Sequence, residues 1–396
     1  MNAARASGPI LVLNAGSSSI KCGLYEGAGR RLARLARVHA DLRDDALVLT
    51  VERASDRRVA ALARPETAAW EAAIALVLER AAEVAAGPIA AVGHRVVHGG
   101  GRFERPVVVT PEALRELAAL EPLAPLHQPQ NVAGIRAAAA ALPAAIQVVC
   151  FDTAFHHTCP PVATRLAIPR PWHDRGIRRY GFHGLSYESV VARLPELIGG
   201  IPERAVIAHL GAGASLCGLH RGRSIATTMG FTPLDGLVMA TRSGSIDPGA
   251  VLHLILREGL SAAEVETMLT RESGLLGVSG SSGDMRVLLA SDDPLAAEAV
   301  ELFCERAARE TASLAAALGG LDALVFTAGI GEHAAAIRER IARKLTWLGL
   351  KLDANTNAGH GPRISTTESR VTAWVIPTDE EGVIAAHTLA ATASPR

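Results

Sequence analysis

The sequence predicts an α/β protein built from two related domains, and three observations support this fold class. The chain has 396 residues, more than one hydrophobic core usually holds. A strand–turn–strand motif occurs twice, about half the chain apart, and residues 321–345 read as a buried strand, a glycine turn and an amphipathic helix. We therefore expect domains at residues 1–152 and 153–381, with a last helix at 382–396 packing back on the first domain.

The repeated motif reads VLNAGSSSIKCGLYEG in the first half of the chain and IAHLGAGASLCGLHRG in the second. An ungapped alignment pairs Gly16 with Gly211 and Cys22 with Cys217, an offset of 195 residues. Each copy predicts a hairpin whose small loop residues expose backbone N–H groups suited to phosphate. Neither loop is a Walker loop, because the G-x-x-x-x-G-K-[ST] pattern is absent from the sequence. Two such hairpins facing one cleft could bind a single polyphosphate, an arrangement that resembles the ribonuclease H-like domains of the actin, Hsp70 and sugar-kinase superfamily.

The remaining elements follow from apolar runs and from the proline and glycine positions. In the first half we expect, in order, a hairpin at 9–26, strands within 34–63, helices at 66–86 and 111–120, a buried strand at 90–100, a proline-rich loop at 123–131, an alanine-rich helix, and a strand ending at Asp152. In the second half we expect a long loop at 160–179, a hairpin at 205–220, a loop at 227–249, helices within 250–317, the unit at 321–345, and a final strand, acidic turn and helix.

The composition excludes several classes of protein. Forty basic and forty acidic residues give a formal charge of zero, which argues against a nucleic-acid partner or a membrane surface. The five cysteines form no C-x-x-C pair, which favours reduced thiols in a cytoplasmic protein. No apolar run approaches the length of about 18 residues that a membrane span requires, so none is expected. Lys21 is one of only three lysines in the chain, and it lies in the first hairpin.

Polar residues concentrate at the predicted ends of strands, where ligands bind in α/β folds. Arg95 interrupts an apolar strand and requires an anionic partner, which could be a substrate or a structural carboxylate. Asp152 ends a buried strand, where a carboxylate often handles a metal or a proton. His127 follows a proline-rich stretch and could equally be a surface residue. His183 stands between glycines, and Arg242 lies in a Gly/Ser turn that also contains Asp247.

These residues lie within a series of motifs that resembles the acetate kinase, or short-chain carboxylate kinase, family over nearly the whole chain. The motifs are NAGSSSIK, HRVVHGG, LAPLHQPQN, FDTAFH, RRYGFHG, HLGAGAS, TTMGFTPLDGL, TRSGSIDPG, SGLLGVSGSSGDMR, FTAGIGEH and IPTDEE. The resemblance implies transfer of a phosphoryl group from ATP to a short carboxylate such as acetate, giving an acyl phosphate and ADP. It also implies Mg²⁺, with Mn²⁺ as an alternative, and a homodimer.

The resemblance also implies roles for individual residues. Catalysis would involve Asp152, His183 and Arg242, with the last two on the transferring phosphoryl group. The substrate would contact Arg95 through its carboxylate, and Val97, Leu126, His127, Phe182 and Pro233 around its methyl group. The nucleotide would contact Lys21, His209, Leu210, Gly211, Ala212, Gly213, Asp284, Met285, Arg286, Gly329, Ile330, Gly331, Glu332 and His333. The metal would be positioned by Asn14 and Glu380.

The chemistry of this reaction is consistent with those roles. Phosphoryl transfer needs alignment and positive charge around the phosphoryl oxygens more than covalent help. A carboxylate nucleophile, with a pKa of about 4–5, is already ionised at pH 7 and needs no general base. We therefore expect Asp152 to orient the metal and water rather than to remove a proton.

Four positions depart from the pattern of the family. Ala212 and His333 stand where asparagine is usual, Ala240 stands where glycine is usual, and Ser245 stands where aspartate is usual. Losing one hydrogen bond to a charged phosphate costs roughly 1.5–3 kcal/mol, or about 10–150-fold in rate or affinity. We expect a working enzyme that is slower or has an altered nucleotide preference.

Several alternatives stay open at this point. One methylene in an apolar pocket is worth only about 1–3 kcal/mol, so propionate and butyrate remain possible substrates, although Val97 favours acetate. Ala212 and His333 leave room for pyrophosphate or another phosphoryl donor. A non-catalytic nucleotide-binding protein would keep the fold without turnover. A sugar kinase does not fit Arg95, because a neutral sugar offers that side chain no anion.

Overall fold

The computed structural model describes residues 8–15, 19–28, 31–42, 46–53, 56–63, 69–85, 87–125 and 127–393. The chain divides into two compact units: unit 1 comprises Met1–Ala154 with Asp379–Arg396, and unit 2 comprises Phe155–Thr378. Residues 379–381, expected in the second domain, thus belong to unit 1. The glycine and serines of the first predicted phosphate loop, residues 16–18, lie outside the described residues.

Within the described ranges, unit 1 contains an eight-stranded sheet in the order β5-β4-β3-β2-β1-β6-β8-β7. Strands β1 to β5 pair antiparallel with their neighbours, whereas β1, β6 and β8 run parallel. The strands are β1 (Ile10–Ala15), β2 (Ser19–Ala28), β3 (Arg31–Leu42), β4 (Ala46–Arg53), β5 (Asp56–Ala63), β6 (Ala91–Val96), β7 (Val107–Val108) and β8 (Ile146–Phe151).

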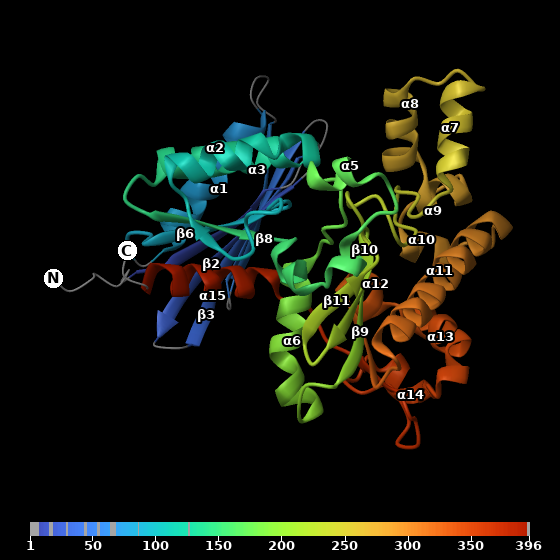
Figure 1. Cartoon of the computed structure of the whole chain (residues 1–396). Helices are drawn as coiled ribbons and strands as arrows, with labels where there is room; N and C mark the ends of the chain where they lie inside the picture. The colour runs from blue at the N-terminus through green and yellow to red at the C-terminus, as the bar shows by residue number, and fades with distance from the viewer. Residues whose placement is uncertain are drawn as a thin grey trace. The chain divides into compact units, whose positions relative to one another are not determined.

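Helices cover both faces of this sheet (Figure 1). On one face, α1 (Ala69–Val84) and α3 (Gln128–Ala141) enclose a core with alternate residues of β1 and β2, including Leu11, Leu13 and Cys22. On the other face lies α15 (Glu380–Ala393), and Gly93 of β6 allows its close approach, since a Cβ there would lie 2.2 Å from Thr388 Oγ1. Helix α2 (Pro111–Ala119) and a 3-10 turn at Glu121–Leu123 complete unit 1.

The described part of unit 2 contains a five-stranded sheet in the order β11-β10-β9-β12-β13. Its strands are β9 (Arg204–Leu210), β10 (Ala214–His220), β11 (Arg223–Thr227), β12 (Ala323–Thr327) and β13 (Thr372–Val375). Strands β9, β10 and β11 are antiparallel, and β9, β12 and β13 are parallel. This order and these directions match those of β3, β2, β1, β6 and β8 in unit 1, so the predicted duplication of an α/β fold is confirmed.

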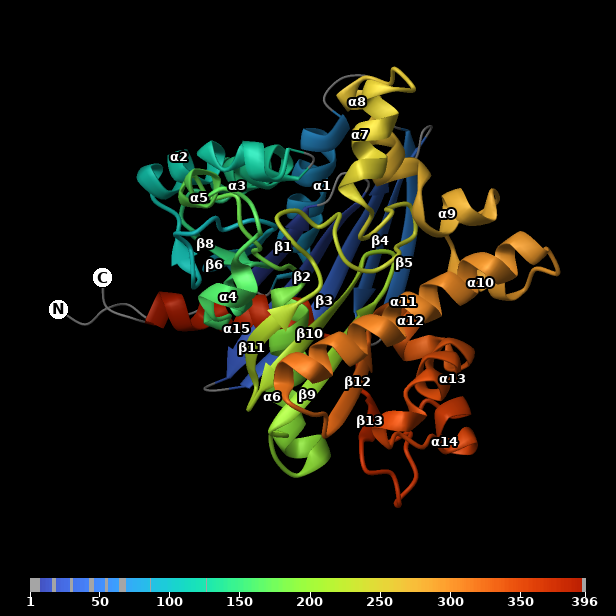
Figure 2. The same cartoon turned by 45° about the vertical axis from the view of Figure 1, so that its right-hand side comes forward.

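The sheet of unit 2 packs on one face against α6 (Gly184–Ile198) and on the other against the long α11 (Pro294–Leu318) (Figure 2). Helices α7 (Pro248–Leu256) and α8 (Ala262–Thr267) stand side by side away from the sheet. The other helical segments are α4 (Pro161–Thr164), α5 (Arg170–Asp174), a 3-10 turn at Ala154–Thr158, a π-helical turn at Met268–Glu272, α9 (Gly274–Ser279), α10 (Met285–Leu289), α12 (Ala328–His333), α13 (Ala335–Lys344), a 3-10 turn at Thr346–Leu348 and α14 (Ala354–Ala358).

Three local expectations need correction. The predicted loop at 123–131 already becomes helical at Gln128, because Pro129 suits the first turn of a helix. The predicted loop at 160–179 contains α4 and α5. The predicted glycine turn at 329–333 is the short helix α12, because Glu332 Oε1 accepts a hydrogen bond from Ala328 N at 2.9 Å and so caps the first turn.

None of the helices within the described ranges combines the length and the apolar character needed to cross a membrane.

Candidate active site

In unit 1, the predicted polar residues share one face of the sheet. Leu13 and Ala15 of β1 point into the core beneath α1, so the alternation of the strand places Asn14 on the opposite face. Lys21 of β2 lies directly opposite Asn14 in the antiparallel pair. Arg95 follows His94, which pairs with Leu13, and therefore lies beside Asn14 at the end of β6. The carboxyl ends of β1, β6 and β8 thus gather Asn14, Arg95 and Asp152.

Arg95 is the centre of this group. Its Nε and Nη2 atoms donate to the two carboxylate oxygens of Asp152, at 3.1 and 2.5 Å, and its Nη1 donates to Asn14 Oδ1 at 3.3 Å. Glu380, the first residue of α15, places Oε2 3.9 Å from Arg95 Nε. Burial lowers the pKa of Arg95, but the charges of Asp152 and Glu380 outweigh it and raise that pKa above its usual value. The guanidinium therefore stays charged.

The anion that Arg95 requires is thus partly supplied by Asp152. A guanidinium has five N–H groups, and the hydrogen bonds within the described residues use three of them. The other two lie one on each Nη atom, and N–H groups on the two Nη atoms are the donors that guanidinium groups use for carboxylates. Arg95 can therefore hold its structural partner and a substrate anion at the same time.

Asn14 and Glu380 fit the chemistry of Mg²⁺, which prefers oxygen ligands and usually takes one or two from the protein, the rest coming from water and phosphates. Both side chains approach the same guanidinium, so their oxygens lie in one small region of unit 1. The described residues contain no group of three His, Cys, Asp or Glu side chains arranged as a metal cage. Such a cage is not needed by an ion that is shared with a nucleotide.

In unit 2, two further predicted residues meet at Gly213, in the loop between β9 and β10. A Cβ atom on Gly213 would lie 2.7 Å from Arg242 Nη2 and 3.4 Å from His183 Nε2. Arg242 is anchored by a 2.6 Å hydrogen bond from Nη1 to the carbonyl of Pro233. A glycine lets both side chains approach the loop in their present positions, so Arg242 Nη2 and His183 Nε2 lie close to the same backbone segment.

His183 is held in an uncommon conformation. Its φ of 59° lies in the left-handed region, which costs a non-glycine residue about 1 kcal/mol or more and is found at functional sites. Its ring stacks on His209 of β9, with 4.1 Å between the ring centroids. The preceding Phe182 is buried, and its carbonyl accepts a hydrogen bond from His156 Nε2 at 2.9 Å. Burial lowers the pKa of His156 to about 4, so that ring is neutral near pH 7.

Two of the predicted nucleotide segments, residues 284–286 and 329–333, lie at short helices of unit 2. Asp284 is the N-cap residue of α10, and its carboxylate accepts hydrogen bonds from the Arg286 side chain at 2.6 and 3.1 Å. These hydrogen bonds lower the pKa of Asp284 to about 2. Glu332 Oε1 accepts from the backbone N–H groups of both Ala328 and Thr378, so this side chain is committed to shaping α12. His333 is exposed.

The predicted residues around the substrate methyl group are divided between the units. Val97 is buried in unit 1, and its N–H donates to Asn131 Oδ1 at 3.0 Å. His127 occupies the N-cap position of α3, and its side chain makes no capping hydrogen bond there. Phe182 and Pro233 belong to unit 2, and Leu126 lies outside the described residues. The methyl pocket therefore stays a prediction.

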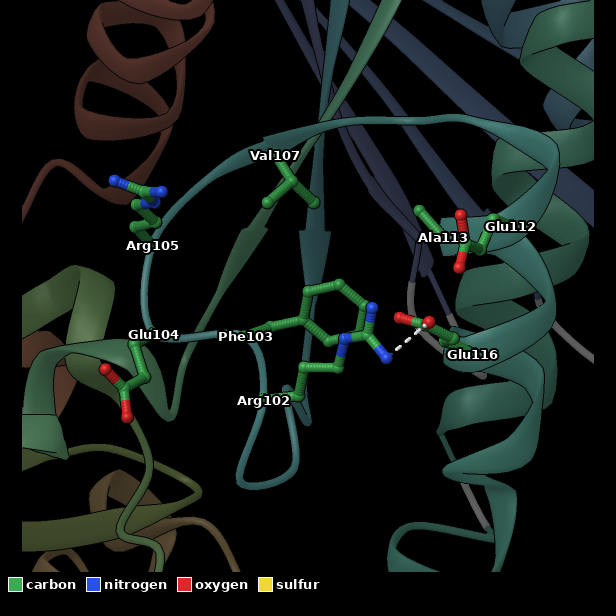
Figure 3. A pocket seen from close by; sticks show the side chains of 8 residues that line it. All are labelled: Arg102, Phe103, Glu104, Arg105, Val107, Glu112, Ala113 and Glu116. Atoms are coloured by element: carbon green, nitrogen blue, oxygen red, sulfur yellow. Dashed lines mark ion pairs between the residues drawn. The ribbon is translucent and has the colours of Figure 1, made fainter.

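A separate pocket of about 270 Å³ lies on unit 1 (Figure 3). Arg102 faces Glu116 of α2 across this pocket at 2.6 Å, so its charge is paired. Phe103 lines the pocket, and its ring stacks on that of Phe151 of β8, with 5.0 Å between the ring centroids. None of the predicted site residues lines this pocket, and it is not the candidate site.

Sequence reasoning missed three buried residues beside the site. Ser215 bonds His183, Tyr187 bonds Ser215, and Arg338 donates to the carbonyls of Gly331 and Glu332 in α12. Only Ser215 carried a signal, as the last letter of the HLGAGAS motif. The other two stand in amphipathic helical sequence, where their types are unremarkable.

The repeated sheets define the fold class as that of the actin, Hsp70 and sugar-kinase superfamily, and comparisons with known proteins narrow it. An acetate kinase of Rhodopseudomonas palustris (strain TIE-1) is 60% identical over 304 residues, covering 76% of each chain. A propionate kinase structure from Francisella tularensis has a TM-score of 0.88 at 38% identity, covering 96% of this chain and 99% of the other. A Porphyromonas gingivalis acetate kinase structure has a TM-score of 0.85 at 37% identity, covering 97% and 99%.

The sequence profile of the acetokinase family matches residues 9–386, and the chain belongs to that family.

Proposed function

We propose that this chain is an ATP:acetate phosphotransferase, which transfers the γ-phosphoryl group of ATP to acetate in a reversible reaction that gives acetyl phosphate and ADP. The observation that carries the proposal is the convergence of Arg242 and His183 on Gly213. Two nitrogen atoms that can donate hydrogen bonds, Arg242 Nη2 and His183 Nε2, reach the same loop and suit the oxygens of a phosphoryl group during transfer. Membership of the acetokinase family supports the same reaction.

In the proposed mechanism, unit 1 binds the carboxylate. The two remaining N–H groups of Arg95 orient acetate, whose oxygen attacks the γ-phosphorus without needing a base. Asp152 holds the guanidinium in place through its two hydrogen bonds and so acts by orientation rather than by proton removal. Asn14 and Glu380 would hold Mg²⁺, which when bound neutralises charge on the phosphate oxygens.

In the same mechanism, unit 2 binds the nucleotide. The N–H of Gly211 closes the loop onto the Gly213 carbonyl at 3.1 Å, and the backbone N–H groups of Ala212 and Gly213 would bind the phosphates. The short helix α12 would lie beside the adenosine. Arg242 supplies a positive charge and His183 a hydrogen-bond donor to the equatorial oxygens of the phosphoryl group. The P–O bond to ADP breaks as the new P–O bond to acetate forms, and ADP leaves with the bonding electron pair.

The direct test is the trapping of acyl phosphate with hydroxylamine. Purified protein with Mg²⁺-ATP and acetate should give acetyl hydroxamate, and Arg95→Ala should lower its rate by about 10²-fold or more, since a charged partner of the substrate is lost. Arg102→Ala is the matched control, because Arg102 pairs with Glu116 outside the site. Absence of hydroxamate despite ATP binding would contradict the proposal.

A second candidate substrate is propionate, which is favoured by the TM-score of 0.88 to the propionate kinase of Francisella tularensis. Running propionate and butyrate in the same trapping assay compares kcat/KM for the three acids. We expect acetate to lead because Val97 is a branched, buried residue. The same assay with pyrophosphate in place of ATP tests the alternative donor that Ala212 and His333 leave open.

We further propose that the enzyme is a homodimer formed through α7. This helix has the sequence PGAVLHLIL, and none of its residues is buried in the single chain. Leu252 and Leu256 are 55% and 68% exposed, and an apolar, uncharged surface of this kind suits a copy of itself. Light scattering should give a dimer mass for the natural chain and a monomer mass for Leu252→Glu/Leu256→Glu; two equal masses would exclude this interface.

We also place the enzyme in the cytoplasm. The five cysteines are free thiols, which suits a reducing compartment that also supplies ATP.

A further inference from the structure

A row of hydrogen-bonded side chains lies behind His183. Nδ1 of His183 is 2.8 Å from Ser215 Oγ, and the same Oγ bonds the hydroxyl of Tyr187. Ser215 and Tyr187 are fully buried, at 0% exposure each. Tyr187 stands one helical turn after His183 on α6, and its N–H donates to the His183 carbonyl at 3.1 Å. Ser215 stands two residues after Gly213, so the row is fixed to the phosphate loop.

The positions of the protons in this row follow from burial. Burial raises the pKa of Tyr187 well above its usual value, so its hydroxyl keeps its proton. A buried hydroxyl proton needs an acceptor, and within the described residues the acceptor that contacts Tyr187 is Ser215 Oγ. Ser215 must then direct its own proton to the remaining neighbour, His183 Nδ1. A ring that accepts at Nδ1 carries its hydrogen at Nε2.

His183 Nε2 is also the atom that faces the phosphate loop. A Cβ atom on Gly213 would lie 3.4 Å from His183 Nε2. The same position would lie 2.7 Å from Arg242 Nη2. The row of hydroxyls therefore aims a ring N–H at the space that the guanidinium of Arg242 also reaches.

We propose that Tyr187 and Ser215 are positioning residues that hold His183 as its neutral Nε2–H tautomer, which donates a hydrogen bond to an oxygen of the transferring phosphoryl group. This inference rests on the proposed function for the identity of the acceptor. It assigns to His183 the role of an uncharged donor, and it leaves the positive charge of unit 2 at this place to Arg242.

The surroundings of the ring agree with an uncharged state. A second proton on Nδ1 would face the Ser215 hydroxyl, whose own proton would lose its acceptor in a buried place. The positively charged Arg242 guanidinium reaches the same loop as the His183 ring, and the His209 ring stacks on it at 4.1 Å. His209 in turn pairs through Nδ1 with Ser186 Oγ at 2.8 Å.

The test is the tautomer itself, read by long-range ¹H–¹⁵N NMR of protein labelled with ¹⁵N-histidine, without substrate. The His183 signals are assigned by their loss in His183→Gln. We expect the natural protein to show the Nε2–H pattern, and Tyr187→Phe/Ser215→Ala, which removes both hydroxyls together, to show a mixture of tautomers. An Nδ1–H or doubly protonated ring at pH 7 in the natural protein would overturn the proposal, as would an unchanged pattern in the double variant.

Two further variants separate positioning from a merely structural role. Ser215→Thr keeps a hydroxyl and should keep the Nε2–H pattern, whereas Ser186→Ala removes the partner of His209 and should leave the His183 signals unchanged. In the trapping assay, the double variant should lose about tenfold in kcat with KM for acetate within about twofold, since one transition-state donor is misdirected. Should the natural protein show the Nε2–H tautomer yet form no acyl phosphate with any acid, the proposed function fails while the hydrogen-bonded row stands.

Discussion

Gly213→Ala should separate the activity of this protein from its stability. The added Cβ would lie 2.7 Å from Arg242 Nη2, so the guanidinium must move by about 0.7 Å to reach ordinary contact. The hydrogen bond from Arg242 Nη1 to the Pro233 carbonyl, at 2.6 Å, holds one nitrogen of the guanidinium and leaves Nη2 able to move. The clash is therefore relieved by the far end of a flexible side chain rather than by the backbone.

The size of the effect follows from two opposing contributions. Displacing a charged donor by a large fraction of 1 Å costs about 10- to 100-fold in kcat, because the geometry of the transition state is lost. Gly213 does not take the left-handed backbone conformation. Replacing such a glycine by alanine restricts the unfolded chain and stabilises the fold by about 0.4–1 kcal/mol. The variant should therefore be much slower and at least as stable.

The assay is steady-state hydroxamate formation, with kcat and the KM values for ATP and acetate, together with thermal unfolding. Gly218→Ala is the matched control, because it lies on the same hairpin and its Cβ would meet Leu314 at an ordinary 3.4 Å. We expect the control to keep kcat within about twofold. An unchanged kcat in Gly213→Ala would refute the reasoning, and so would a fall in Tm large enough to explain the lost activity.

Three other predictions follow from the same structure. Ala212→Asn adds an amide at an exposed loop position and should lower KM for ATP by up to about tenfold; an unchanged KM would mean that the site does not use this position. Arg338→Lys should raise KM for ATP severalfold while KM for acetate stays constant, because the fully buried guanidinium holds the carbonyls of α12, and equal rises in both KM values would contradict this. Burial lowers the pKa of three histidines to about 4, so the folded state resists their protonation while the unfolded state takes up protons below about pH 6.5. The free energy of unfolding, measured with urea between pH 7 and pH 4, should therefore fall with falling pH by up to about 1.4 kcal/mol per pH unit for each histidine, and a flat profile would exclude this linkage. These histidines are His94, His98 and His156.

The sequence determined the duplicated α/β fold because a hairpin is a local feature. The apolar alternation and the glycines that form it lie within about 16 residues, so both copies could be recognised and aligned through Cys22 and Cys217. Each cysteine lies on the second strand of its sheet and faces a buried core, as the alignment implies. The placement of Asn14, Arg95 and Asp152 at strand ends was also predictable, since parallel strands end at one edge of a sheet.

The direction of each hydrogen bond was decided only by the tertiary structure. Nothing in the sequence pairs Arg95 with Asp152, 57 residues away, or joins Ser215 to a tyrosine on a different element. Such contacts depend on side-chain rotamers and on which groups burial leaves without water. The sequence therefore determined which charged and polar residues this protein brings to its strand ends. Packing decided which of them hold one another and which donors point into open space, because a buried polar group must take whatever partner the fold places beside it.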